Sequence, residues 1–480
     1  MPGTGAHLVP LDQPRDALRS HTVESQRKLS RFICTTIAED RRSRKRAGMH
    51  YKPIHGEAKR KRSVERYDTL IVGGGQAGAQ AAIALKQRKY LGSIAIIGDE
   101  PHLPYERPPL SKDYLAGSRS FDRLLIRPRH YWNEQGISLL SESRVVTVDS
   151  KHCEVRLSDG RTFAYGTLVW AAGGYPRRLG CSGHDLMGVH YVRTCQDVDR
   201  IQNELNRVTD IVIVGGGYIG LETAATLSKL CKRITVLEAM DRVLARVAGE
   251  QLSHFYEAEH RGHDVDVRVC AQVEGIEGQC GRVTGVRLAT GHLIPAQMVI
   301  VGIGILPAVE PLLSAGAEGG NGVMVDGFCR TSLPNIYAIG DCAAHVNEFA
   351  GGATIRLESV QNAVDQAAVV AKSIAGTPER YLTVPWFWSN QYDLKLQTVG
   401  LCLGHDHTVL RGDPSARSFA LVYLKRGHIV ALDCVNAPKD FVEGKVLVAN
   451  GARIDIALLA DGSIRLKEMA RTLPSTSMRT

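Results

Sequence analysis

The sequence predicts an α/β protein with two Rossmann-like dinucleotide-binding domains and a C-terminal α+β domain. Two glycine-rich turns, 73–78 and 215–220, carry this prediction, because each fits G-x-G-x-x-G between a β-branched run and a run rich in alanine and leucine. Residues 381–480 have no such turn, and their short alternating apolar runs are typical of a small antiparallel sheet followed by a helix.

The first predicted unit runs from a strand into the turn at Gly73. In this kind of turn Gly73 allows the tight bend, Gly75 leaves room for a pyrophosphate, and Gly78 lets helix and strand pack closely. The N-terminus of the helix that follows offers unpaired N–H groups to the phosphates. The next apolar strand, 94–98, ends at Asp99, and a carboxylate there can accept ribose hydroxyls.

The second unit repeats this pattern with Gly215, Gly217 and Gly220, and its second strand ends at Glu238. A carboxylate at that position accepts both adenosine ribose hydroxyls and repels a 2′-phosphate, so the sequence favours NADH over NADPH. Arg242 lies four residues on, and arginine is the residue type that a 2′-phosphate would need. Two dinucleotide sites in one chain indicate a flavin and a nicotinamide that exchange electrons.

The rest of both halves follows one order, which predicts a duplicated architecture. Each half continues with an alternating β-meander that contains a hairpin turn. The first meander spans 139–170 with its turn at 158–161, and the second spans 265–304 with its turn near 277–279. Two further helices are expected at 197–206 and 358–374. Residues 335–341 form a strand that ends in Gly-Asp and opens toward the second of these helices.

The net charge of +9 comes from the first 62 residues, which hold 15 Lys and Arg against 6 Asp and Glu. We predict residues 1–66 to be a basic, disordered extension, the alternative being a true start downstream, near Met49. Such runs usually stay solvated, so nucleic acid is not expected as a partner. The chain has no run of 18 apolar residues and no apolar segment typical of a secretory signal, so neither a membrane span nor export is expected.

The eleven cysteines are scattered, with no two within five positions of each other. This spacing excludes C-x-x-C redox pairs and the tight spacings of zinc or iron–sulfur sites, so no metal site is predicted. The thiols are interpreted as structural residues of a protein that works in a reducing compartment, the cytoplasm.

Three further segments, 104–112, 355–363 and 385–392, resemble those of FAD-dependent NADH:ferredoxin reductases of the pyridine nucleotide-disulfide oxidoreductase fold, which serve cytochrome P450 and ring-hydroxylating dioxygenase systems. The resemblance covers about residues 67–480. It implies that NADH reduces FAD, and that FAD reduces an acidic [2Fe–2S] ferredoxin, in a protein that is a monomer or weak dimer. The implied domains are FAD-binding, 67–177 and 308–380; NAD-binding, 178–307; and interface, 381–480.

The resemblance also implies site residues. Lys112 and Glu222 are the catalytic candidates: Lys112 should lie beside the flavin, where a positive charge favours the negative charge that develops on reduction, and Glu222 should pair with it. Tyr218 resembles an aromatic residue that gates the nicotinamide pocket. The residues expected to hold FAD are Gly73, Gly75, Ala77, Gly78, Asp99, Arg107, Lys112, Val145, Arg193, Asp341, Val360 and Trp388, and those expected to hold NADH are Gly215, Gly217, Tyr218, Gly220 and Glu238.

Two alternatives stay open. A rubredoxin, nitrite-system or quinone-type NADH reductase has the same fold, and a flavoprotein of the apoptosis-inducing-factor kind would use its basic surface on nucleic acid. Disulfide reductases and NADH peroxidases are disfavoured because the segment from Gly78 to Cys153 contains no cysteine in between.

The C-terminal region also predicts how a partner docks. Residues 381–480 hold 12 Lys and Arg against 9 Asp and Glu, and an excess of positive charge would steer an acidic ferredoxin. The candidate docking residues are Lys395, Arg411, Lys425, Arg426, Lys439 and Lys445.

Overall fold

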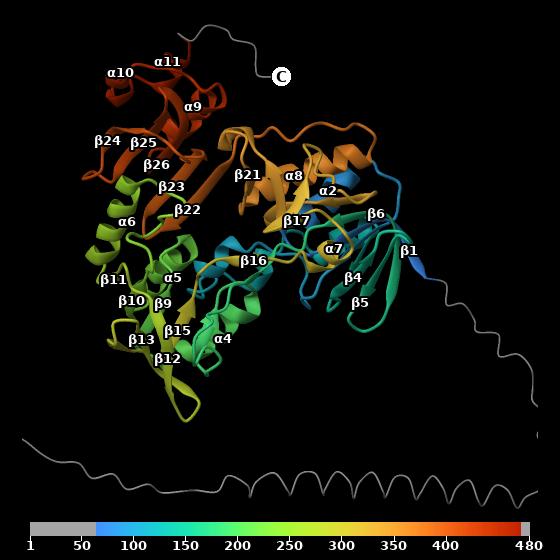
Figure 1. The fold of residues 1–480 in the computed structure, drawn as a ribbon, viewed down its shortest axis with the longest axis horizontal. Coiled ribbons are helices and arrows are strands. Elements are labelled where there is room, and N and C mark those ends of the chain that lie inside the picture. The colour runs from blue at the N-terminus through green and yellow to red at the C-terminus, as the bar shows by residue number, and fades with distance from the viewer. Residues whose placement is uncertain (1–63, 472–480) are drawn as a thin grey trace, which may run out of the picture. The chain divides into compact units, whose positions relative to one another are not determined.

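The computed structural model describes residues 64–471, and its strands and helices are drawn in Figure 1. The predicted basic extension lies outside the described residues except at its last three positions. There β1 (Glu65–Val72) begins two residues earlier than expected, because Glu65 and Arg66 already pair with Phe163 and Ala164 of a neighbouring strand.

A seven-stranded sheet joins two segments that are distant in the chain. Its order is β3-β2-β1-β6-β5-β4, and β19 pairs parallel with the end of β6. The other strands are β2 (Ile94–Ile97), β3 (Ile137–Leu140), β4 (Val145–Asp149), β5 (Glu154–Leu157), β6 (Thr162–Trp170) and β19 (Ile336–Ala338). The parallel strands β1 and β2 are largely buried, as their β-branched runs predict. The strand before the Gly-Asp turn therefore belongs to the sheet of the first glycine turn.

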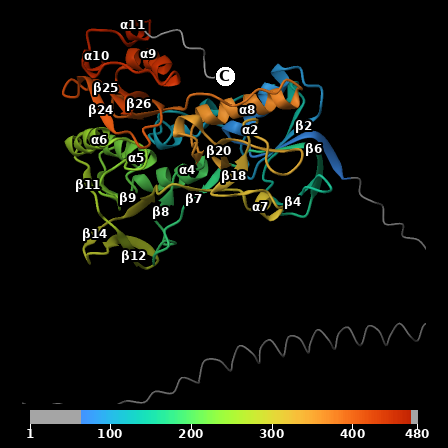
Figure 2. The ribbon, with the colours of Figure 1, turned by 45° about the horizontal axis from the view of Figure 1, so that its top comes forward.

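Helices and short strands cover this sheet. The helices α2 (Gln76–Gln87) and α8 (Val360–Ile374) lie side by side and share one core cluster (Figures 1 and 2). The remaining elements of these segments are η1 (Pro108–Ser111), η2 (Phe121–Leu124), α3 (Arg129–Glu134), α7 (Glu310–Ser314), β17 (Gly319–Gly320), β18 (Gly322–Val325), η3 (Gly340–Cys342), β20 (Ala343–Val346), η4 (Glu348–Ala350) and β21 (Thr354–Arg356). The helix predicted at 358–374 is confirmed as α8, which begins at Val360, and the elements η3, β20, η4 and β21 lie between it and the Gly-Asp turn.

The second glycine turn lies in a five-stranded parallel sheet of order β11-β10-β9-β15-β8. Its elements are β8 (Val189–Tyr191), α4 (Cys195–Leu205), β9 (Asp210–Val214), α5 (Tyr218–Lys229), β10 (Arg233–Leu237), α6 (Glu250–Gly262), β11 (Asp266–Arg268) and β15 (Met298–Val301). The helix α4 starts two residues before its predicted start because Thr194 caps it. Thr194 Oγ1 accepts a hydrogen bond from Asp197 N, and the Asp197 carboxylate accepts one from Thr194 N.

A meander and a short pair complete this half, namely β12 (Val273–Gln279), β13 (Arg282–Leu288) and β14 (Leu293–Pro295), with β7 (Gly174–Pro176) antiparallel to β16 (Ile305–Pro307). The hairpin turn expected near 277–279 lies directly after these residues. Those residues belong to β12, and the turn is Cys280-Gly281, where both residues have positive φ, as a two-residue hairpin requires.

The C-terminal sheet is antiparallel, in the order β22-β23-β26-β25-β24. Its elements are β22 (Trp386–Gln391), β23 (Leu394–Gly400), β24 (His407–Asp413), β25 (Ser418–Lys425), β26 (His428–Val435), α9 (Pro438–Ala449), α10 (Ile456–Ala460) and α11 (Leu466–Arg471). The sequence predicted one terminal helix, whereas three follow the sheet within the described residues. Across residues 64–471, no helix has the length and apolar character needed to cross a bilayer.

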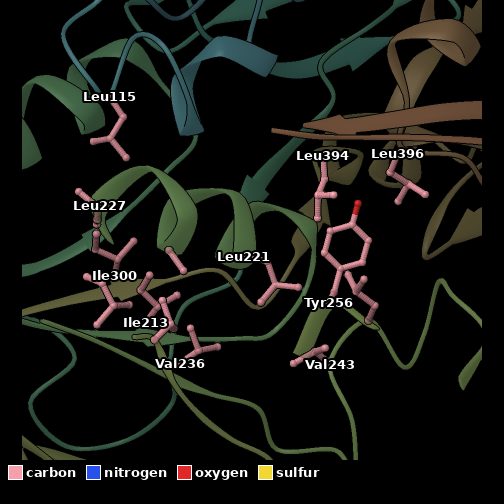
Figure 3. Packing of buried hydrophobic residues seen from close by; sticks show 14 of the residues in the cluster. Leu115, Ile213, Leu221, Leu227, Val236, Val243, Tyr256, Ile300, Leu394 and Leu396 are labelled. Atoms are coloured by element: carbon pink, nitrogen blue, oxygen red, sulfur yellow. The ribbon is translucent and has the colours of Figure 1, made fainter. Parts of the chain in front are cut away.

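One core cluster ties the loop after η1 to the second parallel sheet and to the C-terminal sheet. It contains Leu115 from the loop after η1, Leu221 of α5, Tyr256 of α6, and Leu394 and Leu396 of β23. Figure 3 shows the two β23 leucines next to the ring of Tyr256. Burying these side chains contributes roughly 1.5–3 kcal/mol each, so the cluster fixes the second glycine turn and the C-terminal sheet against the loop.

Candidate functional site

The first glycine turn has the geometry that a bound pyrophosphate needs. Gly73 has a φ of +116°, and a Cβ there would lie 2.2 Å from the carbonyl oxygen of Ala171. A Cβ on Gly78 would lie 2.0 Å from the carbonyl oxygen of Gly73, so only glycine fits either position. At Gly75 no described atom lies within 4 Å of a Cβ, which leaves the backbone open before α2.

The second turn repeats these contacts. Gly215 has a φ of +111° and meets the carbonyl oxygen of Gly302, with 2.4 Å to an added Cβ. Gly220 meets Gly215 in the same way at 2.0 Å, while a Cβ at Gly217 has no neighbour within 4 Å among the described residues. Both turns therefore leave the second glycine open and pack the first and third, which is how a dinucleotide fold admits a pyrophosphate.

Both turns open onto one cavity of about 810 Å³, a volume within the usual range for ligand pockets. Fourteen of the predicted site residues line it: Gly73, Gly75, Ala77, Asp99, Arg107, Lys112, Arg193, Gly217, Tyr218, Glu222, Glu238, Asp341, Val360 and Trp388. Gly78, Gly215 and Gly220 lie in the turns behind the lining, as their packing role requires. The cavity joins the two predicted cofactor sites in one space.

Val145 is the predicted site residue that the structure places differently. Its side chain is buried on β4 and packs in a core cluster with Val148 and Leu157. The lining of the cavity does not include it. Its predicted contact with FAD stays a prediction.

Buried and half-buried charges form a network at the first site. Arg107 Nη2 donates to Glu100 Oε1 at 2.6 Å, and Arg107 Nη1 donates to the carbonyl oxygen of Arg193 at 2.6 Å. Arg193 Nη1 lies 3.7 Å from Asp341 Oδ2. Burial lowers the pKa of Arg193, and the neighbouring Arg107 lowers it further. The network thus links the loop after β2 to the Gly-Asp turn, and it presents two guanidinium groups to the cavity, which suits a diphosphate.

Lys112 and Glu222 meet across the cavity wall. Lys112, the residue after η1, donates from Nζ to Glu222 Oε2 at 2.5 Å. Ser111 Oγ donates to the same oxygen at 2.6 Å, and Ser389 Oγ donates to Glu222 Oε1 at 2.7 Å. The Glu222 carboxylate is buried, and these three donors compensate its lost hydration. An ammonium held this way is a fixed positive charge beside the cavity.

Aromatic side chains form another part of the wall. Trp386, Phe387 and Trp388 of β22 all line the cavity, and the Trp386 and Trp388 rings are 5.6 Å apart between centroids. Tyr218, the first residue of α5, lies against Phe387 with 4.6 Å between ring centroids. Burial raises the pKa of Tyr218 well above its ordinary value. Flat rings at this position can exclude water from a planar ring system.

Glu238 faces the second turn, and its neighbour Arg242 is engaged elsewhere. Glu238 Oε2 accepts from Gly216 N at 2.7 Å, and Oε1 accepts from Met240 N at 2.9 Å. Arg242 donates to Ser253 Oγ at 2.6 Å and to the carbonyl oxygens of two residues of its own loop. The guanidinium of Arg242 therefore holds that loop in shape, while the Glu238 carboxylate lines the cavity directly after β10.

Sequence reasoning missed Asp433. It lies on β26, lines the cavity, and accepts a hydrogen bond from Tyr423 Oη at 2.7 Å. Burial raises the pKa of Asp433 to about 7, with the Tyr423 bond acting in the opposite direction. The available signal was an acidic residue inside the apolar run 428–435, where a solvated charge is not expected.

The cysteine beside the Gly-Asp turn is inert. Cys342 is buried, with its sulfur near the carbonyl oxygens of Ile339 and Trp170 at 3.3 and 3.7 Å. Burial raises the pKa of the Cys342 thiol to about 12, so the thiolate nucleophile is scarce at neutral pH. All ten described cysteines are free thiols, and residues 64–471 contain no group of three or more His, Cys, Asp or Glu placed to hold a metal ion.

Comparisons with known proteins show which family the chain belongs to. Residues 67–367 match the model of the family described as pyridine nucleotide-disulphide oxidoreductase, and residues 386–470 match the reductase C-terminal model. A relative from Sphingobium sp., named 5,5′-dehydrodivanillate O-demethylase ferredoxin reductase subunit, is 58% identical over 84% of this chain and 98% of its own length.

Two solved structures have the same fold. The ferredoxin reductase for the CYP199A2 system from Rhodopseudomonas palustris is 39% identical, with a TM-score of 0.81, and the match covers 84% of this chain and all of that chain. The covalent complex of putidaredoxin reductase with putidaredoxin contains a chain 36% identical, with a TM-score of 0.82, over 86% of this chain and 99% of that chain.

Proposed function

Because the chain belongs to the pyridine nucleotide-disulphide oxidoreductase family, we propose that it is an FAD-dependent NADH:ferredoxin reductase. It would pass electrons from NADH to a [2Fe–2S] ferredoxin that serves a cytochrome P450 or a ring-hydroxylating dioxygenase. The observation that carries the proposal is the single cavity onto which both glycine turns open, because two dinucleotides must meet for electrons to pass between them.

The residues present fit FAD at the first turn. The open backbone at Gly75 and the N-terminus of α2 suit a pyrophosphate, and Asp99 is exposed at the end of β2, where a ribose would lie. Arg107 and Arg193 add positive charge on the cavity side. We propose the same division of roles at the second turn, where Gly217 is open and Glu238 takes the ribose of NADH.

FAD supplies the chemistry when bound, since it accepts a hydride from NADH and releases electrons singly to an iron–sulfur partner. The chain's own groups bind, orient and polarise. Lys112 offers positive charge to the negative charge that develops on reduction, and Glu222 holds Lys112 in place. Trp388 and Tyr218 narrow the space in which two planar rings would stack.

We propose the domain boundaries 67–177 with 308–380 for FAD, 178–307 for NADH, and 381–480 for the partner-facing domain. The pairing of β19 with β6 supports the joining of the first two segments. The five-stranded parallel sheet, whose strands run in sequence from β8 to β15, supports the second domain. We also propose that the protein works in the cytoplasm, which suits the ten free thiols among residues 64–471.

The proposal is tested on the purified protein. It should be yellow, release one FAD per chain on denaturation, and be bleached by NADH without oxygen. With reduced protein in hand, a [2Fe–2S] ferredoxin, a rubredoxin and a soluble quinone are then compared as acceptors. Faster reduction of the ferredoxin supports the proposal, whereas faster reduction of rubredoxin or quinone selects the other kind of NADH reductase. Absence of bound flavin would reject both.

A further inference from the structure

A continuous hydrogen-bonded chain of side chains runs from α6 to Lys112. Its members come from four separate segments, and their order is Tyr392, His260, Gln391, Ser389, Glu222 and Lys112. The successive donor–acceptor distances are 2.9, 2.8, 3.3, 2.7 and 2.5 Å. The four central side chains are 5% exposed or less. Buried polar groups arranged in one line are unusual, because each must find a partner in an apolar interior.

The chain has a direction, which the chemistry of its members decides. Gln391 Oε1 faces His260 Nε2 and Gln391 Nε2 faces Ser389 Oγ, so the imidazole must donate from Nε2. His260 Nδ1 then accepts from the Tyr392 hydroxyl. Ser389 receives a bond from Gln391 and donates its own proton to Glu222 Oε1. Every donor therefore points toward the Glu222 carboxylate.

The surroundings of His260 keep it neutral. Burial lowers the pKa of His260 to about 4; the Gln391 bond acts in the opposite direction, and nearby His263 lowers the pKa further. His263 stacks on the Tyr392 ring with 3.7 Å between centroids, and the Tyr392 ring in turn lies 5.1 Å from that of His260. A protonated imidazole would donate from both nitrogens and would lose the bond from Tyr392.

We infer that Ser389, Gln391 and His260 are positioning residues that fix the orientation of the Glu222 carboxylate and, through it, the Lys112 ammonium at the cavity wall. The argument lies in how the two carboxylate oxygens are shared. Oε1 takes Ser389, which leaves Oε2 for Lys112 and Ser111. Without a donor on Oε1, the carboxylate is free to rotate, and the ammonium loses its fixed partner.

This inference rests on the proposed function, in which Lys112 lies beside the flavin. The measured quantity is therefore the two-electron midpoint potential of bound FAD. Lys112→Ala should weaken the stabilisation of reduced over oxidised flavin about tenfold, which lowers the potential by about 30 mV. Ser389→Ala should weaken this stabilisation at least threefold, which lowers the potential by about 14 mV or more. Thr69→Val removes another buried hydroxyl, one on β1 that lies outside the hydrogen-bonded chain and outside the cavity lining, and it should leave the potential unchanged.

A double variant makes the test specific. If Ser389 acts through Lys112, Ser389→Ala adds no shift to Lys112→Ala, whereas an independent effect would add in full. His260 supplies a second pair of variants should Ser389→Ala not fold. His260→Leu leaves Gln391 Oε1 without its donor and should lower the potential, and His260→Gln, which keeps an N–H donor, should restore it.

A second readout does not depend on flavin chemistry. In the holoenzyme labelled with ¹⁵N-histidine, the resonances lost in His260→Gln identify His260. They should report the neutral Nε2–H form from pH 6 to 8, and a charged ring or an Nδ1–H form would overturn the inference. The inference is also overturned if Lys112→Ala shifts the flavin potential and Ser389→Ala does not. That result would leave the proposed function standing. If Lys112→Ala itself causes no shift, the positioning role falls together with the role of Lys112, while flavin content and ferredoxin reduction by the wild type judge the reductase assignment separately.

Discussion

Lys112 Nζ lies 2.5 Å from Glu222 Oε2, although 110 residues separate the two in the chain. The pair joins the loop after the first dinucleotide unit to the helix that opens the second. The Glu222 side chain is 3% exposed and that of Lys112 17%. A buried ion pair of this kind contributes little net stability, because desolvation offsets the attraction. Its place beside the cavity points to a functional reason for it.

Lys112→Ala should slow reduction of the flavin by NADH by about ten- to a hundredfold, since positive charge is lost where negative charge develops. Stopped-flow absorbance under anaerobic conditions measures this step directly. The control is Lys151→Ala, an exposed lysine in the β4–β5 turn, which should keep the wild-type rate. Flavin reduction at the wild-type rate in Lys112→Ala would remove Lys112 from the mechanism.

Glu238→Ala should erode the preference for NADH over NADPH by about tenfold, because the ribose hydroxyls lose their acceptor and a 2′-phosphate loses its repulsion. The measurement is kcat/KM for each nucleotide with ferricyanide as acceptor. Glu274→Ala, at an exposed position on β12, serves as the matched control. An unchanged ratio would show that Glu238 does not read the ribose.

Asp433→Asn should change how stability depends on pH. The pKa of Asp433 is about 7 when folded and near 4 when unfolded, so between these values the native state binds more protons. This carboxyl therefore contributes stability below pH 4 that is lost as pH rises through 7, up to about 4 kcal/mol.

The asparagine variant does not ionise and keeps an acceptor for Tyr423. The melting temperature of Asp433→Asn relative to that of the wild type should rise as the pH is raised from 5 to 8. Asp264 is an exposed aspartate, and Asp264→Asn should show no such trend. A parallel pH dependence in Asp433→Asn and wild type would mean that Asp433 is ionised in the native protein at both pH values.

Arg411 was predicted as a docking charge, and the structure corrects this. Its side chain is buried, and its guanidinium donates to Asp440 Oδ1 at 3.1 Å and to the carbonyl oxygens of Asp461 and Ile464 at 2.5 and 2.6 Å. Arg411→Ala should therefore destabilise the C-terminal domain by about 3 kcal/mol, measured by thermal unfolding. The exposed Lys425 is the control, since Lys425→Ala should leave the melting temperature unchanged. A fully stable Arg411→Ala variant would show that the hydrogen bonds of Arg411 do not stabilise the C-terminal domain.

The sequence predicted what depends on local chain geometry. Gly73 and Gly215 have the positive φ expected of them, because the requirement for glycine there comes from the turn itself. Prediction from the sequence failed where contacts between distant segments determine the surroundings of a side chain. Arg411 reads as a solvated charge in sequence, and only the three-helix end of the chain reveals the carbonyl groups that bind it. The hydrogen-bonded series of side chains from His260 to Lys112 joins segments that lie more than 100 residues apart in sequence, and no spacing pattern indicates it.

The hairpin at Cys280-Gly281 shows a third limit, which concerns the exact position of a turn. Gly278 and Gly281 both suit a turn, and the sequence offers no reason to choose between them, but strand register places the bend at the second. Asp433 failed for a related reason, because a single acid in an apolar run has no partner visible in sequence until Tyr423 is placed beside it.

The reductase assignment is tested most directly by NADH-driven reduction of cytochrome c through an added acidic [2Fe–2S] ferredoxin, titrated with salt beside direct reduction of ferricyanide. Lys395, Lys425 and Lys439 are exposed on the C-terminal domain and would steer an acidic partner. Steering weakens as the Debye length falls from about 10 Å at 0.1 M salt to about 3 Å at 1 M. We predict that ferredoxin accelerates electron flow and that this coupled rate falls with salt much more than the direct rate. If no ferredoxin accelerates electron flow, or if both rates fall equally, the ferredoxin-reductase assignment is contradicted.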